Sequence, residues 1–214
     1  MSRTIPLGAL ALFMALALTG CQAQCPVPAP ASEPTPAEQT AVNESPPIDV
    51  GGAVNLSDLR AMALYENLAY GVNISYPEEW IAQEPDPNDL GIVVGFLAPG
   101  EDPNNPQDYV TVQIQSLPAD QKITLDQYTQ SVIRSLKSSY PDFALLAQAN
   151  MVLANQPGNV MVYTVTSEKT LYQIMLAETI KENKAYIITY YALADRYSEF
   201  ENDAKRMINS FELI

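Results

Sequence analysis

A proline-rich tract confines folding to the C-terminal part of the chain. Between residue 22 and about residue 58, large apolar side chains are almost absent and Pro, Ala, Glu, Ser and Thr dominate. Such a stretch cannot bury enough apolar surface to offset the entropy lost on ordering, so we expect a flexible linker over residues 21–58. The remaining residues, 59–214, are predicted to form one domain. The prolines of the tract are Pro26, Pro28, Pro30, Pro34, Pro36, Pro46 and Pro47.

Residues 1–20 have the pattern of a cleaved signal peptide. Arg3 supplies a positive charge, and the apolar run that ends at Leu18 is too short to span a bilayer. Leu18-Thr19-Gly20-Cys21 then resembles the bacterial and archaeal lipoprotein signal, in which a small residue and Gly or Ala precede a lipid-modified Cys. The alternative is an ordinary secretory signal followed by a chance cysteine.

The lipoprotein resemblance implies that Cys21 starts the mature protein and carries a diacylglyceryl group. Such a group anchors a protein durably, so we expect the domain at the extracytoplasmic face of a membrane: periplasmic, lumenal or cell-surface, depending on the organism. Cys25 then has no intramolecular partner. It is either an inert thiol in the linker or a site of intermolecular bridging.

Strand patterns dominate residues 59–214. Val110, Val112 and Ile114 alternate with polar residues, as in a half-buried strand. The last strands in the sequence follow one another closely, with turn signals at 156–159 and at 182–183, which indicates consecutive antiparallel hairpins. Further strands are predicted near 72–76, 91–98, 144–153, 159–167, 170–181 and 184–193.

Two helices are predicted among these strands. Thr124 and Gln127 form a capping box, and apolar residues then recur at helical spacing until Pro141. Ser198 and Glu201 repeat the capping pattern before a second apolar stripe that ends at Phe211. Strands and helices do not alternate as βαβ units, so the sequence predicts an α+β domain with an antiparallel sheet covered by helices.

Two segments resemble the PsbP-like family. Gly71 to Trp80, with Tyr76-Pro77 and Trp80 at its end, is similar to the opening motif of PsbP-like domains, and the segment from Lys184 to Phe211 is similar to their closing strand and helix. The resemblance implies the PsbP/Mog-type α/β/α sandwich, a central antiparallel sheet flanked by helices. It is strongest to the uncharacterised archaeal and bacterial lipoproteins of this group.

Aromatic residues are assigned to the core. Pro77 stops a strand because it lacks a ladder donor, and Trp80 can then cover the sheet with a large apolar surface. The strand tyrosines have Ile, Val, Leu and Met as neighbours, which favours packing over a groove for a stacked ligand. These tyrosines are Tyr163, Tyr172, Tyr186, Tyr190 and Tyr191.

The chain contains no histidine, which excludes Ser-His and Cys-His nucleophiles and imidazole-ligated zinc. It has no Gly-rich phosphate loop, dinucleotide fingerprint or Ser-x-x-Lys pattern either. We therefore expect no catalytic residues. The resemblance also covers PsbP-like proteins that serve photosystem II and use histidine among their metal-contacting residues, so their metal sites cannot be carried over to this chain.

Acidic residues are concentrated in one region. The formal net charge is −14, and no Lys or Arg occurs from Ala61 to Gln121. This field argues against nucleic-acid binding and against docking flat on an anionic membrane. The acids there are Glu66, Glu78, Glu79, Glu84, Asp86, Asp89, Glu101, Asp102, Asp108 and Asp120.

Two Pro/Asn-rich loops carry most of these acids. Their carboxylates are hard ligands of the kind that calcium prefers, and the candidates are Asp86, Asp89, Glu101, Asp102 and Asp108. An EF-hand is not formed, because Leu90 and Leu97 stand where ligands are needed. A solvated acidic surface is the alternative to a calcium site, and no other cofactor is expected.

The sequence thus predicts a lipid-anchored, extracytoplasmic, noncatalytic binding or assembly domain for a membrane or envelope protein. Glu101, Asp102 and Asp108 are its candidate partner-binding residues. One alternative is an auxiliary protein of photosystem II, if the organism is photosynthetic. The other is a lipoprotein that binds calcium or a small ligand.

Overall fold

The computed structural model describes residues 61–85 and 91–214. The signal peptide, the linker with Cys21 and Cys25, and the candidate ligands Asp86 and Asp89 lie outside these residues. In chain order the elements are β1 (Met62–Asn67), β2 (Val72–Pro77), β3 (Ile81–Gln83), β4 (Ile92–Leu97), β5 (Tyr109–Ser116), α1 (Leu125–Ser139), β6 (Ala144–Leu153), β7 (Gln156–Ser167), β8 (Thr170–Lys181), β9 (Lys184–Leu193), α2 (Tyr197–Ser210) and β10 (Glu212–Leu213).

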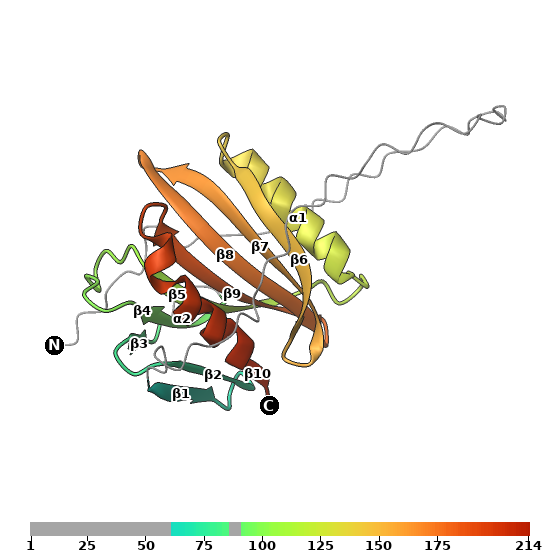
Figure 1. The fold of residues 1–214 in the computed structure, drawn as a ribbon. Coiled ribbons are helices and arrows are strands. Elements are labelled where there is room, and N and C mark those ends of the chain that lie inside the picture. The colour runs from blue at the N-terminus through green and yellow to red at the C-terminus, as the bar shows by residue number, and fades with distance from the viewer. Residues whose placement is uncertain (1–60, 86–90) are drawn as a thin grey trace.

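The strands form two sheets (Figure 1). A seven-stranded sheet has the order β3-β4-β5-β9-β8-β7-β6, and a three-stranded sheet has the order β1-β2-β10. All neighbouring strands are antiparallel. The predicted α+β architecture, a mostly antiparallel sheet with two helices, is confirmed.

The central strands are apolar on both faces, and each face packs against a different helix. In β7, Met161 and Tyr163 pack in the same cluster as the buried side chains of α1, whereas Val160 and Val162 pack in the cluster that contains those of α2. The second cluster also contains β2, so the small sheet and α2 share one face of the large sheet. Figure 1 shows this sheet between α1 and α2.

Helix α1 begins where the sequence predicts. The Thr124 side chain accepts a hydrogen bond from the Gln127 backbone N–H, and the Gln127 side chain accepts one from the Thr124 N–H. The capping box at Ser198 is wrong. Arg196 is the N-cap of α2 and forms no side-chain cap, so Ser198 and Glu201 lie inside the helix. The chain enters α2 from a turn in which the Arg196 N–H donates to the Leu193 carbonyl, and the helix begins at Tyr197, one residue before Ser198.

Hairpin turns differ from prediction at one place. Glu182 and Asn183 have φ values of 50° and 59°, which is the predicted two-residue turn. The turn predicted at 156–159 is wrong, because Ala154 and Asn155 turn instead, with φ values of 50° and 58°. Pro157 fits inside β7 because pairing with β8 begins only at the next residue, so no ladder bond to β8 requires its missing N–H.

The aromatic side chains lie in the core as predicted. Trp80 is 3% exposed, and its ring meets Phe200 of α2 edge-on at 5.6 Å between centroids. All five strand tyrosines are buried, and Tyr109 stacks on Tyr191 across β5 and β9. These rings therefore serve packing and are not an exposed stacking surface.

The two predicted caps allow a matched test. Thr124→Ala removes a cap that is present and is expected to lower the free energy of unfolding by about 1 kcal/mol. Ser198→Ala removes a hydroxyl that caps nothing and should change it by less than about 0.5 kcal/mol. Urea unfolding of both variants measures this difference, and equal losses would contradict the assignment of the caps.

Candidate functional site

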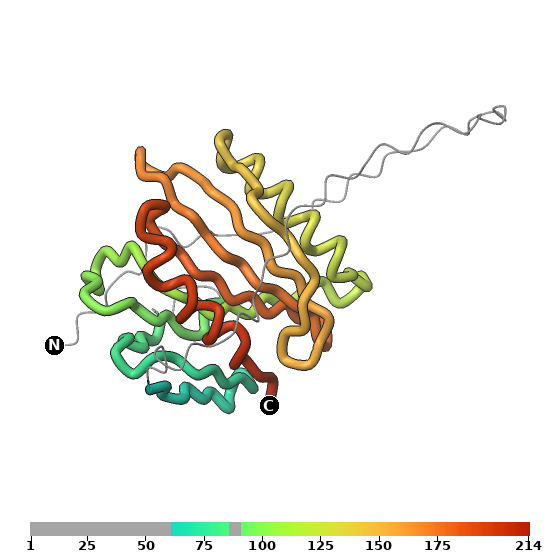
Figure 2. The backbone as a smooth tube through the Cα atoms, viewed as in Figure 1, coloured from blue at the N-terminus to red at the C-terminus, as the bar shows by residue number. Residues whose placement is uncertain are grey.

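The loop of residues 98–108 joins β4 to β5 and carries three of the candidate acids. Its ends are closed by a hydrogen bond from the Ala98 N–H to the Asp108 carbonyl, at 3.0 Å. It starts in a turn at Gly100, whose φ of +86° is readily adopted only by glycine. Figure 2 shows the loop beside the start of α2.

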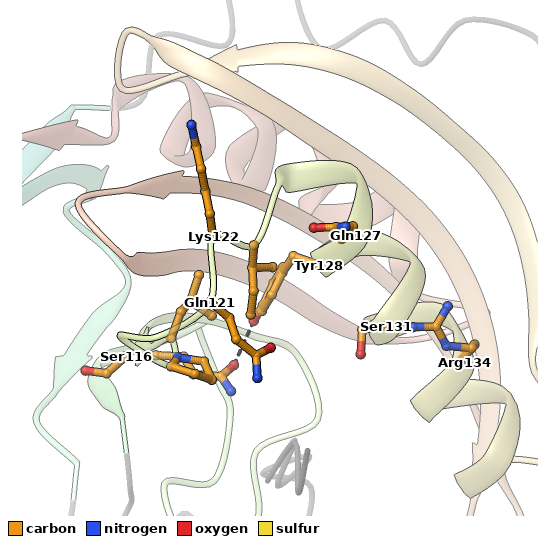
Figure 3. Close-up of a pocket in the computed structure, with 11 residues that line it drawn as sticks. Ser116, Gln121, Lys122, Gln127, Tyr128, Ser131 and Arg134 are labelled. Atoms are coloured by element: carbon orange, nitrogen blue, oxygen red, sulfur yellow. Dashed lines mark hydrogen bonds between the residues drawn. The ribbon is translucent and has the colours of Figure 1, made fainter. Parts of the chain in front are cut away.

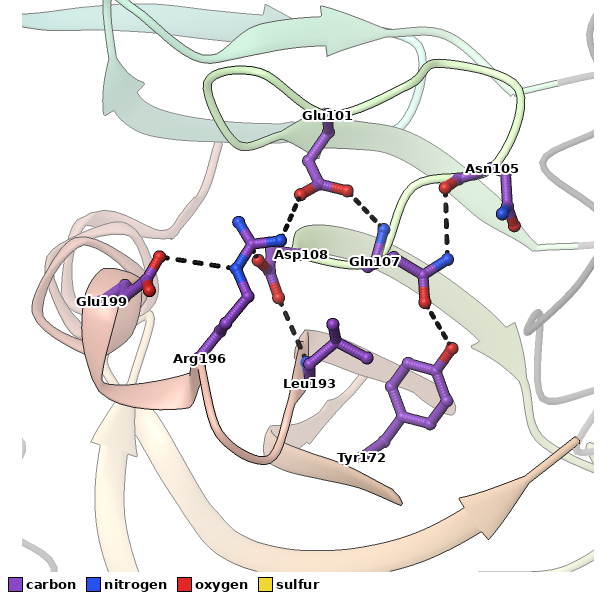
Figure 4. A network of polar contacts seen from close by, with 8 residues as sticks. All are labelled: Glu101, Asn105, Gln107, Asp108, Tyr172, Leu193, Arg196 and Glu199. Carbon is purple, nitrogen blue, oxygen red and sulfur yellow. Dashed lines mark hydrogen bonds and ion pairs between the residues drawn. The ribbon is translucent and has the colours of Figure 1, made fainter. Parts of the chain in front are cut away.

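Arg196 connects this loop to the start of α2 (Figure 4). Its guanidinium lies 2.7 Å from Asp108 Oδ2 and 3.3 Å from Glu101 Oε1. Its Nε also faces Glu199, at 3.5 Å. Asp108 is fully buried, and its Oδ1 accepts a hydrogen bond from the Leu193 N–H. One arginine therefore holds two acids of the loop against the end of β9.

Gln107 extends the network to β8. Its backbone N–H donates to Glu101, and its side-chain Oε1 accepts from the Tyr172 hydroxyl at 2.7 Å. Its Nε2 donates to the Asn105 carbonyl. The loop is thus fixed from both ends and from the sheet beneath it, as the dashed lines in Figure 4 show.

Burial raises the pKa of Asp108 to about 6, against the opposing effects of the Leu193 N–H and the Arg196 charge. Above that pH the buried carboxylate is charged and depends on Arg196 for compensation.

Asp102 is placed differently from the other two acids of the loop. Its Oδ1 accepts hydrogen bonds from the backbone and the side chain of Asn104, at 2.9 and 3.0 Å. These bonds lower its pKa, and the side chain is exposed. The structure therefore brings Glu101 and Asp108 together and leaves Asp102 at the surface.

Among residues 61–85 and 91–214, no three His, Cys, Asp or Glu side chains are grouped closely enough to hold a metal ion. Calcium binding by the five candidate acids stays a prediction.

Arg196 is a functional candidate that the sequence analysis missed. Tyr109 at the start of β5 pairs with Tyr191 near the end of β9, so the residues that flank them lie close together at the same end of these two neighbouring strands. A sequence pattern shows which residues form strands but not which strands are neighbours. Arg196 comes close to Asp108 only because β5 pairs with β9. An arginine just before a predicted helix was the available signal.

A pocket of about 530 Å³ lies at the start of α1 (Figure 3). Its apolar wall includes Leu117 and Ile123, and the Tyr128 hydroxyl donates to Gln115 Oε1 at 2.8 Å. Ligand pockets commonly have volumes of roughly 300–1,000 Å³. The lining residues are Gln115, Ser116, Leu117, Pro118, Gln121, Lys122, Ile123, Gln127, Tyr128, Ser131 and Arg134.

The pocket lining is polar and apolar in equal parts and contains no acidic residue. Carboxamides and hydroxyls supply most of its polar groups, whereas Lys122 and Arg134 form none of the ion pairs between described residues. In Figure 3 the Lys122 side chain extends away from Arg134, so the two cations do not converge on one point. The pocket therefore suits an uncharged, polar small molecule better than a compact anion.

A buried carboxyl group lies beneath α1. Glu178 of β8 is fully buried and accepts a short hydrogen bond from the Thr129 hydroxyl of α1. Burial raises the pKa of Glu178 to about 7, although the Thr129 bond opposes this effect. The group thus changes charge near neutral pH while lying inside the fold.

Removal of Arg196 should destabilise the protein mainly above pH 6. Arg196→Met leaves the buried Asp108 charge unpaired at pH 8, and we expect a loss of about 2 kcal/mol in the free energy of unfolding. At pH 5 the loss should be smaller, because Asp108 takes up a proton. Glu199→Gln, at an exposed partner of the same arginine, is the control and should cost less than about 0.5 kcal/mol. An equal loss from Arg196→Met at both pH values would contradict this account.

Glu178 should make stability fall as pH rises. Its pKa is about 7 in the folded state against an ordinary 4.5, so its stabilising contribution is complete below pH 4.5 and is lost through pH 7. The free energy of unfolding of Glu178→Gln, taken relative to that of the unchanged protein, should therefore rise by about 2 to 3 kcal/mol between pH 4.5 and pH 8. Denaturant unfolding across this range measures the gain, and a pH-independent difference would contradict the assignment.

The sequence matches the family model for PsbP-like proteins over residues 49–213. No curated protein matches it. Among the described residues, no helix has the length and apolar character needed to cross a membrane.

Solved structures share the fold at low sequence identity. Cyanobacterial PsbP (CyanoP) from Synechocystis sp. PCC 6803 is 15% identical, with a TM-score of 0.55, and the match covers 76% of this chain and 98% of that one. LpqN, involved in cell envelope biogenesis of Mycobacterium tuberculosis, is 12% identical, with a TM-score of 0.51 and coverage of 71% and 84%. With the family match, these similarities confirm the resemblance found in the sequence.

Proposed function

Because the chain belongs to the PsbP-like protein family, we propose that it is a noncatalytic binding or assembly factor for a membrane or envelope protein. Cys21 would tether it by lipid at the extracytoplasmic face of the membrane. Two of the similar folds belong to a cyanobacterial PsbP and to an envelope-biogenesis protein. The absence of histidine from the sequence also supports a role without acid–base catalysis at neutral pH.

The observation that carries the proposal is the clamp on loop 98–108. Arg196, Gln107 and the Leu193 N–H together hold the loop in one conformation. A preorganised loop loses little conformational entropy on binding. Glu101 and Asp108 therefore maintain the shape of the surface, and Asp102 is the acid that meets the partner.

The acidic character of this surface defines the kind of partner. No Lys or Arg occurs from Ala61 to Gln121, so a binding partner should present basic groups at the contact. Nucleic acid is an unsuitable partner, because its phosphates carry the same negative charge as this surface.

Cross-linked capture from native membranes tests the proposal. We expect the unchanged protein to enrich a discrete membrane or envelope protein, and Asp102→Asn to reduce that enrichment about threefold or more at low salt, since rim charges act mainly on association. Glu182→Gln is the control, because this exposed acid lies in the β8–β9 turn at the opposite end of β9. Equal enrichment by both variants would exclude loop 98–108 as the contact.

The anchor is tested separately. Cys21→Ser should shift the protein from the membrane to the soluble fraction, whereas Cys25→Ser should leave it with the membrane. A Cys21→Ser protein that stays in the membrane fraction would contradict lipid tethering at this residue.

The pocket at the start of α1 supports a second candidate function, small-ligand binding. Its volume, its apolar wall and its carboxamide and hydroxyl groups fit an uncharged polar molecule. No enriched protein in either capture sample would favour this function over the first.

A further inference from the structure

The two edges of the seven-stranded sheet are unequal. At one edge β3 has three residues, and at the other β6 has ten. Strand β6 pairs with β7 on its inner side, and no described strand pairs with its outer side. Its outward N–H and C=O groups are therefore available for a further strand.

Apart from a bulge between Leu145 and Ala147, this edge lacks the usual protection against pairing. No Lys, Arg, Asp or Glu occurs between Asp142 and Glu168, and β6 contains no proline. Charged side chains, prolines and short length are the common devices that keep edge strands apart. The net charge of the chain is −14, yet the edge strand β6 carries no charged residue.

Exposed apolar side chains lie near both ends of β6. Leu145 is 40% exposed and Val152 is 72% exposed. They oppose Tyr163 and Pro157 of β7, which lie on the same face of that strand, so both point to the side of the sheet that α1 covers. The register shift between Leu145 and Ala147 makes this possible, because it adds one residue to β6; without that bulge the two side chains would lie on opposite faces.

We propose that two copies of this chain pair through β6, antiparallel and around a two-fold axis at Ala149, to form one continuous sheet. In this register Ala149 faces Ala149 of the second copy, and Gln148 faces Asn150. Beyond the bulge, Leu145 comes opposite Val152 of the second copy at each end of the contact. Cross-strand apolar pairs of this kind stabilise antiparallel strands.

A second copy fits this edge for two reasons. The contact is self-complementary, because the same two apolar side chains pair with each other across the axis, as an isologous interface requires. Two strongly acidic molecules repel one another, and β6 lets their backbones meet with no charge opposite a charge.

Charge variants test the pairing in the full-length chain carrying Cys21→Ser and Cys25→Ser, by sedimentation equilibrium. We expect a dimer. The double variant Leu145→Glu with Val152→Glu places like charges opposite each other twice and should raise the dimer dissociation constant at least tenfold. The double variant Leu145→Glu with Val152→Lys has the same loss of apolar surface but opposite charges across the axis, and it should restore most of the affinity.

The control is Leu64→Glu, at an exposed leucine in β1 of the other sheet, which should leave the dimer unchanged. Circular dichroism confirms that each variant is folded. A monomer at all concentrations would overturn the proposal, as would a dimer that responds to Leu64→Glu or that responds equally to both double variants.

The register is tested by a short bifunctional maleimide. Asn150→Cys in the same background puts one thiol of each copy on the same face and diagonally across the proposed axis, within roughly 8 Å. Efficient cross-linking at this residue, and none in a Leu64→Cys variant, is expected. The reverse pattern would place the contact at β1 and overturn the pairing through β6.

Discussion

Strands β7, β8 and β9 are apolar on both faces, and the rest of the fold follows from the need to cover both. The buried residues of these strands alternate between two clusters, one shared with α1 and the other with α2. A sheet with one polar face could have left that side in water. Here α1 alone covers one face, and α2 together with the three-stranded sheet covers the other. The Ser210 side chain of α2 forms hydrogen bonds with the Ser75 backbone of that small sheet.

The fold buries two carboxyl groups whose pKa values are raised. Glu178 lies beneath α1 with Thr129 as its partner, and Asp108 lies just before β5 with Arg196 as its partner. A hydroxyl is a weaker partner than a guanidinium, which agrees with the higher pKa of Glu178. The buried acids are thus part of the architecture, and the acids left in water, such as Asp102, carry the surface field.

Local signals predicted most of the elements but not the contacts between them. Alternation located β5 and the four strands from β6 to β9, and the Thr124 capping box located the start of α1, because these patterns depend on residues close in sequence. Strands β3 and β10, with three and two residues, are too short to show a period. The role of Arg196 depends on β5 pairing with β9 across an intervening segment that contains α1 and three strands, and no local pattern reports such a pairing. Ser198 shows the converse, since a capping pattern is present in the sequence and yet no cap forms there, because the helix begins one residue earlier, at Tyr197.

The pairing of β10 with β2 has a consequence for the order of folding. Strands β6 to β9 are consecutive hairpins, so they can form while the chain is still emerging and need only short loop closures. The three-stranded sheet instead joins Val72 and Asn73 to Leu213 and Glu212, and the Ile214 N–H bonds to the Gly71 carbonyl. This pairing spans almost the whole domain, so the three-stranded sheet is completed only when residues 212–214 are present, although β1 and β2 can pair earlier. During that interval the apolar side chains of β2 lack the cover that α2 provides in the folded domain, which makes this strand prone to aggregation until the chain is complete.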